Sequence, residues 1–163
     1  MRSVSRILLA EDNPGDVFLV EEALRRHSVP HILTIAADGE AAWDCIEAAE
    51  SPGNPGFDLF LLDLNLPARP GFELLERIRS SRGRIAHVPV VIITSSSAQR
   101  DRAAAERRGA DYYFCKPSHL EEFLELGSIV RGILADGSAR ETAGSHSHGP
   151  KGQEHESPLY RRN

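Results

Sequence analysis

Ionisable and hydroxyl side chains follow or end several short apolar runs of this sequence. The residues concerned are Glu11, Asp12, Asp63, Thr94 and Lys116. The carboxyl ends of parallel strands share one edge of a sheet, where open sheets of this kind bind their ligands. If the apolar runs are such strands, three carboxylates, one hydroxyl and one ammonium meet in one place. Polar residues flank most strands, so no single residue indicates a site here. The combination of all five indicates one.

The three acids in this set predict a cation site. Carboxylates crowded together repel one another, and their pKa values rise unless a cation joins them. Mg²⁺ prefers oxygen ligands and keeps several waters, which suits a site with few carboxylates. Beside such an ion, a free oxygen of Asp63 is a nucleophile placed for in-line attack on a phosphoryl group. Lys116 then adds a positive charge for the phosphoryl oxygens, and Thr94 can donate a hydrogen bond to them.

Five apolar runs predict the strands that position these side chains. The run ending at Asp63 is almost wholly apolar, which is typical of a strand buried on both faces. Between the runs, apolar residues recur at helical spacing, and Asp38 and Ser118 are candidate helix caps. The alternation predicts a doubly wound α/β domain with a five-stranded parallel sheet and five helices. The expected strands are residues 6–10, 31–36, 57–63, 88–93 and 111–115, and the expected helices are about 14–27, 39–50, 72–79, 98–108 and 119–133.

The length favours a single domain, and the charge argues against a surface dedicated to binding nucleic acids or membranes. The chain has 163 residues and a formal net charge of -5, which argues against a nucleic-acid or membrane-surface binder. Its two cysteines, Cys45 and Cys115, form no disulfide or zinc pattern, which fits a reducing cytoplasm. The first apolar run is too short for a signal peptide, and no run approaches a membrane span.

The composition changes near the C-terminus. Residues 136–163 are rich in Gly, Ser, His and charge and have no apolar period. We therefore expect a domain over residues 1–135 and a flexible polar tail over 136–163. The tail residues His146, His148 and His155 are more typical of a solvated segment than of a metal site.

The stretch from about Arg6 to Leu134 resembles the receiver domain of two-component response regulators. The matching pieces are ILLAEDNPGD, DLFLLDLNLP, PVVIITSS and FCKPS, in the order and spacing of that family. Together these motifs are specific, although each alone would be weak. The resemblance implies a flavodoxin-like receiver fold and transfer of a phosphoryl group from a sensor histidine kinase.

The resemblance also implies roles for individual residues. It makes Asp63 the phosphoryl acceptor and Asp12 a direct Mg²⁺ ligand. Glu11 becomes an outer acidic partner that often acts through water, and Asn65 a ligand through its backbone carbonyl. Many members have Asp where this chain has Glu11, and this departure should preserve the metal site.

The remaining implied roles concern the switch. Thr94 becomes the switch hydroxyl, Tyr113 the aromatic switch residue that turns inward after phosphorylation, and Lys116 the partner of the phosphoryl group. The peptide bond between Lys116 and Pro117 is implied to be cis.

Within the family, the motifs look most like the small regulators that partner bacterial phytochromes and have no output domain. A chemotaxis-type motility regulator is the close alternative. An Mg²⁺-dependent aspartyl-phosphate phosphohydrolase is the alternative from another class, because it also needs Asp, Mg²⁺, Thr and Lys. Such enzymes usually carry a general acid two residues after the nucleophile. Asn65 stands there, so we expect no enzyme activity beyond self-phosphorylation and slow dephosphorylation.

The family commonly dimerises through its fourth helix, fifth strand and fifth helix. The fourth helix is basic here on its outer side, with Arg100 and Arg102 among its residues. We expect a homodimer through this face, with Tyr112, Phe114 and Leu124 as candidate contacts.

Overall fold

Five parallel strands form one sheet at the centre of the fold. The computed structural model describes residues 3–143, and the strand order is β2-β1-β3-β4-β5. The doubly wound α/β fold expected from the sequence is confirmed. The strands are β1 (Ser5–Ala10), β2 (His31–Ala36), β3 (Leu59–Leu62), β4 (Val90–Thr94) and β5 (Tyr112–Cys115).

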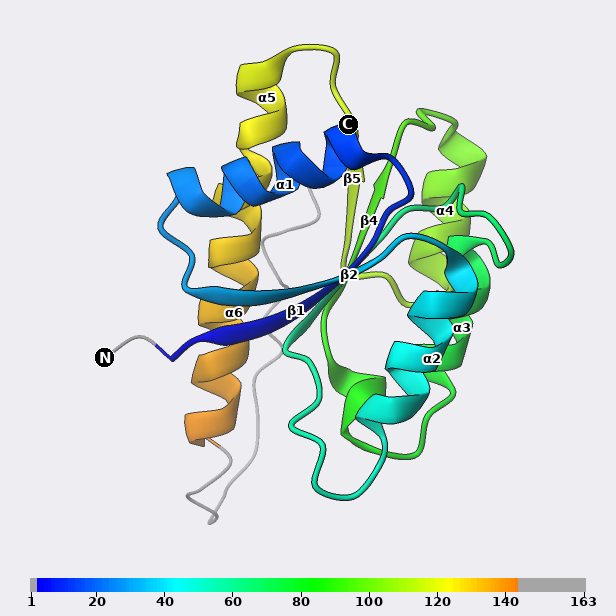
Figure 1. Cartoon of the computed structure of the whole chain (residues 1–163), viewed down its shortest axis with the longest axis vertical. Coiled ribbons are helices and arrows are strands. Elements are labelled where there is room, and N and C mark those ends of the chain that lie inside the picture. The colour runs from blue at the N-terminus through cyan, green and yellow to red at the C-terminus, as the bar shows by residue number, and fades with distance from the viewer. Residues whose placement is uncertain (1–2, 144–163) are drawn as a thin grey trace, which may run out of the picture.

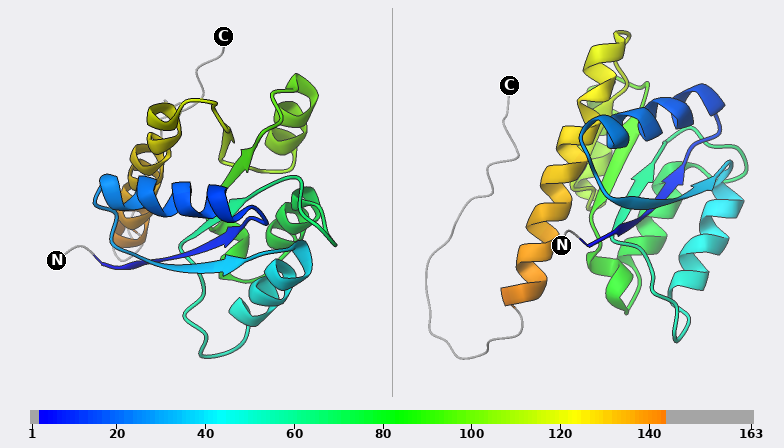
Figure 2. Two further views of the ribbon diagram at one scale, coloured as in Figure 1. Left: turned by 45° about the horizontal axis from the view of Figure 1, so that its top comes forward. Right: turned by 60° about the vertical axis from the view of Figure 1, so that its left-hand side comes forward.

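Helices cover both faces of this sheet (Figure 1). One layer holds α1, α5 and α6, and the other holds α2, α3 and α4, as the two further views in Figure 2 also show. No helix in residues 3–143 combines the length and apolar character that crossing a membrane requires. The helices are α1 (Pro14–Arg26), α2 (Gly39–Ala49), α3 (Gly71–Arg79), α4 (Gln99–Arg107), α5 (Leu120–Leu124) and α6 (Leu126–Ala143), with a short 3-10 helix η1 (Arg84–His87).

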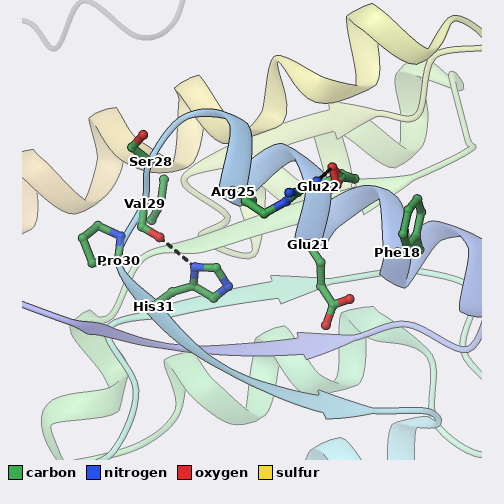
Figure 3. Close-up of a pocket in the computed structure, with 8 residues that line it drawn as sticks. All are labelled: Phe18, Glu21, Glu22, Arg25, Ser28, Val29, Pro30 and His31. Atoms are coloured by element: carbon green, nitrogen blue, oxygen red, sulfur yellow. Dashed lines mark hydrogen bonds and ion pairs between the residues drawn. The ribbon is translucent and has the colours of Figure 1, made fainter.

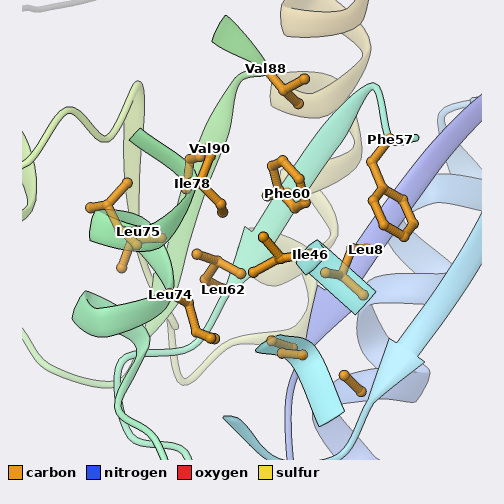
Figure 4. Close-up of a cluster of buried hydrophobic side chains, with 14 of the residues drawn as sticks. Leu8, Ile46, Phe57, Phe60, Leu62, Leu74, Leu75, Ile78, Val88 and Val90 are labelled. Carbon is orange, nitrogen blue, oxygen red and sulfur yellow. The ribbon is translucent and has the colours of Figure 1, made fainter. Parts of the chain in front are cut away.

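Strand β3 is buried on both faces, as its apolar sequence predicts. Phe60 and Leu62 belong to the core under α2 and α3 (Figure 4), and Leu59 and Leu61 belong to the core under α1, α5 and α6. All four side chains have no exposed surface. Burying one such side chain contributes about 1.5–3 kcal/mol to folding. Both cores therefore hold β3 in place, and with it the loop that begins at Asp63.

β3 begins at Leu59 and β4 at Val90, each two residues later than expected. Pro89 has no backbone N–H to donate to a neighbouring strand, which shortens β4 at its start. At Asp58 the backbone N donates to the carbonyl oxygen of Arg6 at 2.7 Å, and the side chain accepts a hydrogen bond from the backbone N of Arg6 at 2.8 Å.

The C-terminal helix differs from the sequence-based expectation at its start. Ser118 does not cap it, because the N-cap residue is His119, whose side chain makes no capping hydrogen bond. The helix is divided at Glu125 into α5 and α6. Gly127 then lets α6 approach α1 closely, since a Cβ at this position would lie 2.0 Å from the carbonyl oxygen of Ala23.

The same helix also runs further than expected. α6 continues to Ala143, so the expected boundary after residue 135 falls inside a helix. Once a helix has formed, each added residue gains a hydrogen bond at little further cost, and Ala, Arg and Glu in this segment are good helix formers. The rest of the expected tail, including His146, His148 and His155, lies outside the described residues.

Gly71 is required where α3 begins against the end of β3. A Cβ at this position would lie 2.1 Å from the carbonyl oxygen of Asp63 and 2.9 Å from the Cα of Leu64. We therefore expect Gly71→Ala to push the Asp63 backbone out of place and to lower the free energy of unfolding by about 1–3 kcal/mol. Urea denaturation measures this, with Gly132→Ala as control, because a Cβ at Gly132 meets nothing within 4 Å. Equal stability of the two variants would contradict the prediction.

Candidate functional site

The carboxyl ends of the strands bring the candidate residues together. Ala10 at the end of β1 pairs with Leu62 at the end of β3, and Thr94 at the end of β4 pairs with Cys115 at the end of β5. The residues that follow β1, β3 and β5 therefore leave the sheet side by side. The convergence expected from the sequence is confirmed for Glu11, Asp12, Asp63 and Lys116 by the contacts described below. Thr94 joins them through the backbone, because its carbonyl oxygen accepts a hydrogen bond from the backbone N of Lys116 at 2.7 Å.

Lys116 is the central cation of the site. Its Nζ donates to Oε2 of Glu11 at 2.7 Å, to Oδ2 of Asp16 at 2.8 Å and to Oδ2 of Asp63 at 2.9 Å. An ammonium has three donors, so all of them are used. Burial alone would lower the pKa of Lys116, but its hydrogen bonds to the three carboxylates outweigh burial and raise the pKa above the ordinary lysine value. Lys116 is therefore fully charged at neutral pH.

Glu11 is the most deeply buried acid of the site, with 2% of its surface exposed. Burial raises its pKa above the usual value, and hydrogen bonds from Lys116 and from the backbone N of Asn13 oppose this rise. Its Oε1 accepts the Asn13 bond at 3.1 Å. The charged form of Glu11 thus depends on nearby cations.

The acids form a site that fits a hard divalent cation. One carboxylate oxygen from each of Glu11, Asp12 and Asp63 lies within 4.8 Å of the others. Asp12 is exposed, so solvent can complete the coordination of an ion held here. An oxygen-only ligand set that is open to water is the arrangement that Mg²⁺ or Mn²⁺ prefers.

The loop after β3 contacts the Asp63 carboxylate on the oxygen that Lys116 does not bind. The backbone N of Asn65 donates to Oδ1 of Asp63 at 3.0 Å, so each oxygen of this carboxylate has a separate partner. Asn65 as a metal ligand through its carbonyl stays a prediction, as does a cis peptide before Pro117.

Thr94 ends β4, and Tyr113 lies within the neighbouring strand β5. Thr94 is fully buried, and its Oγ1 accepts a hydrogen bond from the backbone N of Ser96 at 3.2 Å. The hydroxyl of Tyr113 donates to the carbonyl oxygen of Ser96 at 2.9 Å, and the guanidinium of Arg102 lies 4.8 Å from the centre of its ring. Burial raises the pKa of Tyr113. The Tyr113 ring is already buried in this structure. Its inward turn after phosphorylation stays a prediction.

Asp16 also belongs to the site, and it is not among the site residues expected from the sequence. Its carboxylate contacts Lys116, and its side chain is 25% exposed. The side chain of Asn13 caps α1 and accepts hydrogen bonds from the backbone N of Gly15 at 2.8 Å and of Asp16 at 3.3 Å. This cap fixes the first turn of α1 at the sheet edge. An acid in that turn, four residues after Asp12, is the sequence signal that could have placed Asp16 in the site.

A hollow beside the outer side of α1 is separate from the site around Lys116. It has a volume of about 630 Å³. Nδ1 of His31 donates to the carbonyl oxygen of Val29 at 2.7 Å, and both residues line the hollow (Figure 3). None of the acids that surround Lys116 lines it, so the site described above does not extend into it. Its lining residues are Phe18, Glu21, Glu22, Arg25, Ser28, Val29, Pro30 and His31.

The candidate dimer contacts are partly wrong. Phe114 and Leu124 are 8% and 6% exposed and belong to the core under α1, α5 and α6. Tyr112 is partly exposed, and the guanidinium of Arg102 contacts the ring of Tyr113. A dimer through this face would therefore use outer polar side chains of α4 rather than Phe114 or Leu124.

Known proteins share this sequence and fold. Residues 7–126 match the response regulator receiver domain family. Response regulator Rcp1 of Synechocystis sp. is 34% identical over 128 residues, which cover 78% of this chain and 84% of Rcp1. The transcriptional regulatory protein TcrA of Mycobacterium tuberculosis is also 34% identical, over 127 residues that cover 77% of this chain and only 46% of TcrA.

Solved structures agree with this match. The phosphorylated cyanobacterial phytochrome response regulator RcpA has a TM-score of 0.73 at 29% identity, covering 82% of this chain and 95% of RcpA. The Mn²⁺-bound form of Rcp1 has a TM-score of 0.70 at 32% identity, covering 78% of this chain and 92% of Rcp1. The matched stretch carries both the sheet and the acids around Lys116. The chain therefore belongs to the response regulator receiver domain family.

Proposed function

We propose that this chain accepts a phosphoryl group on Asp63 from a sensor histidine kinase of the phytochrome type. The observation that carries the proposal is the buried Asp63 carboxylate, 7% exposed, with Lys116 on Oδ2 and the backbone N of Asn65 on Oδ1. The similarity to Rcp1 and RcpA supports the choice of kinase class. A chemotaxis-type regulator remains the alternative within the family.

The proposed reaction is one in-line displacement. An oxygen of Asp63 forms a bond to phosphorus while the bond from phosphorus to the donor breaks, and the electron pair leaves with the donor. Lys116 then pairs with an oxygen of the transferred group, and Thr94 can turn its hydroxyl toward another. Glu11, Asp12 and Asp63 would hold Mg²⁺, together with the carbonyl of Asn65. Bound Mg²⁺ supplies neutralising charge for the phosphoryl oxygens.

The phosphoryl group would act by shifting a population of conformations. It adds about 1.5–2 negative charges and three acceptor oxygens next to Lys116. Movement of Thr94 toward these oxygens would break its bond with Ser96, whose carbonyl also binds Tyr113. The size of the shift is limited by how differently the two conformations bind the phosphoryl group.

Turnover separates this proposal from a phosphohydrolase. Asn65 has no acidic proton to donate, so we expect release of phosphate to be slow and the chain to act as no further enzyme. With acetyl phosphate and Mg²⁺, the proposal predicts uptake of about one phosphoryl group per chain followed by slow decay. Continuous release of many phosphates per chain would contradict it. Transfer from purified candidate kinases, compared at early times, then tests the phytochrome-type partner.

Divalent metal should stabilise the fold. Because the acids repel one another, an ion bound to them raises the free energy of unfolding, by about 2.7 kcal/mol at a concentration one hundred times its Kd. Thermal denaturation with MgCl₂ or with EDTA measures this. We expect Asp12→Asn to lose most of the gain, because Asp12 is a proposed ligand on the exposed side. The control Asp44→Asn removes an exposed acid on α2 and should keep the gain. A gain of equal size in both variants would contradict this metal site.

Dimerisation and location are further parts of the proposal. We propose a homodimer through α4, β5 and the C-terminal helix, in a protein of the cytoplasm. Light scattering with and without beryllofluoride measures the dimer. A monomer in both conditions would contradict this part and leave the acceptor role of Asp63 untouched.

A further inference from the structure

We infer that Asp16 is a positioning residue that competes with the phosphoryl group for Lys116 and so weakens binding of that group. The inference rests on the proposed function and goes beyond it, since it gives a task to a residue outside the acceptor and the metal ligands. Three observations carry it: the saturation of Lys116, the place of Asp16 outside the metal cluster, and the charge of the site.

Lys116 has no free donor. Glu11, Asp16 and Asp63 accept from its Nζ at 2.7, 2.8 and 2.9 Å. An incoming phosphoryl oxygen can bind this ammonium well only if one of the three carboxylates gives up its bond. The strength of these bonds therefore sets how easily Lys116 transfers to a new partner.

Asp16 differs from the other two partners in what else it can bind. Glu11 and Asp63 belong to the cluster of acids that can hold a metal ion, and Asp16 does not. In residues 3–143, Lys116 is the one ion-pair partner of the Asp16 carboxylate. When a metal draws on Glu11 and Asp63, Asp16 still retains Lys116. It then competes directly with the phosphoryl oxygens.

Charge makes this competition unfavourable for the phosphoryl group. Three carboxylates, those of Glu11, Asp16 and Asp63, contact the Lys116 ammonium, and a fourth, that of Asp12, lies beside Glu11 and Asp63. A bound divalent ion still leaves the site negative before the phosphoryl group arrives. Asp16 adds one negative charge that repels the group, and it draws Lys116 toward the first turn of α1 at the same time.

Asp16→Asn separates this role from a structural one. The amide keeps the shape and one acceptor oxygen, and it removes the charge. We expect the affinity for beryllofluoride at saturating Mg²⁺ to rise about threefold to tenfold. We expect the affinity for Mg²⁺ alone to fall about twofold to fivefold, because the site loses negative charge and Lys116 binds Glu11 and Asp63 more strongly. A merely structural role would move both affinities in the same direction.

Isothermal titration calorimetry of the full-length protein measures both affinities, and thermal denaturation checks the fold. The matched control is Glu21→Gln, which removes one charge from an exposed residue of the same helix and should change neither affinity. Asp16→Ala is the second variant and should also bind beryllofluoride more tightly.

Unchanged or weaker beryllofluoride binding by both Asp16 variants would overturn the inference and leave the proposed function standing. Failure of the wild-type protein to bind beryllofluoride with Mg²⁺ would instead overturn the proposed function, and the inference with it.

Discussion

Replacing Lys116 with Met is expected to lower the free energy of unfolding by about 3 kcal/mol at neutral pH in EDTA. The side chain is 12% exposed and pairs with Glu11 and Asp63, whose side chains are 1% and 7% exposed. The substitution keeps a long apolar stem and removes the one ammonium these acids share. It leaves buried carboxylates facing one another without a counter-ion.

Two conditions should reduce this loss of stability. Mg²⁺ should restore part of it, because the ion replaces the missing positive charge. Lower pH should also reduce it: burial already raises the pKa of Glu11, and Lys116 opposes that rise. Without Lys116 the pKa of Glu11 in the folded protein rises further above its unfolded value. The folded variant then binds a proton more readily than the unfolded chain, so its relative stability increases as the pH falls through that raised pKa.

Urea denaturation in EDTA, in Mg²⁺ and across pH measures these effects. The control is Arg26→Met, which breaks the ion pair with Glu121, where the two side chains are 53% and 72% exposed. An exposed pair contributes about 0–1 kcal/mol, so this control should change little. If Lys116→Met in EDTA proved as stable as the control, Lys116 would not be the counter-ion that stabilises the buried acids.

Replacing Asp63 with Asn is expected to reduce phosphoryl uptake from acetyl phosphate to background. An amide is not a nucleophile for this reaction, but its oxygen can still accept the hydrogen bond from the backbone N of Asn65. The substitution also removes one of the acids that repel one another, so the fold should remain intact. Mass spectrometry after incubation with acetyl phosphate and Mg²⁺ measures uptake. Asp44→Asn makes the same chemical change at an exposed position and should label like the wild type.

The convergence of the site could be predicted because it depends on topology. Parallel strands bring their carboxyl ends to one edge, and the apolar runs before Asp63 and Thr94 mark where those ends lie. The deep burial of β3 follows from the same pattern, and its four residues divide between the two cores as an alternating strand requires.

Other features depend on geometry that a strand pattern does not contain. The bond from Lys116 to Asp16 depends on how the first turn of α1 is rotated toward the end of β5. Composition alone suggested a tail after residue 135. The first turns of α6 are held by packing against α1, and the helix then continues from them to Ala143. The burial of Tyr113 depends on the carbonyl of Ser96, whose position is set by the loop after β4.

The most direct test of the central claim is to locate the phosphoryl group itself. The wild-type protein is incubated with acetyl phosphate and Mg²⁺, reduced with borohydride, and digested for mass spectrometry. An acyl phosphate on an aspartate is reduced to the corresponding alcohol, so the modified residue is marked. The account predicts this mark on Asp63 and its loss when Mg²⁺ is replaced by EDTA. A mark on Asp12, Asp16 or any other residue, with Asp63 unmodified, would contradict it.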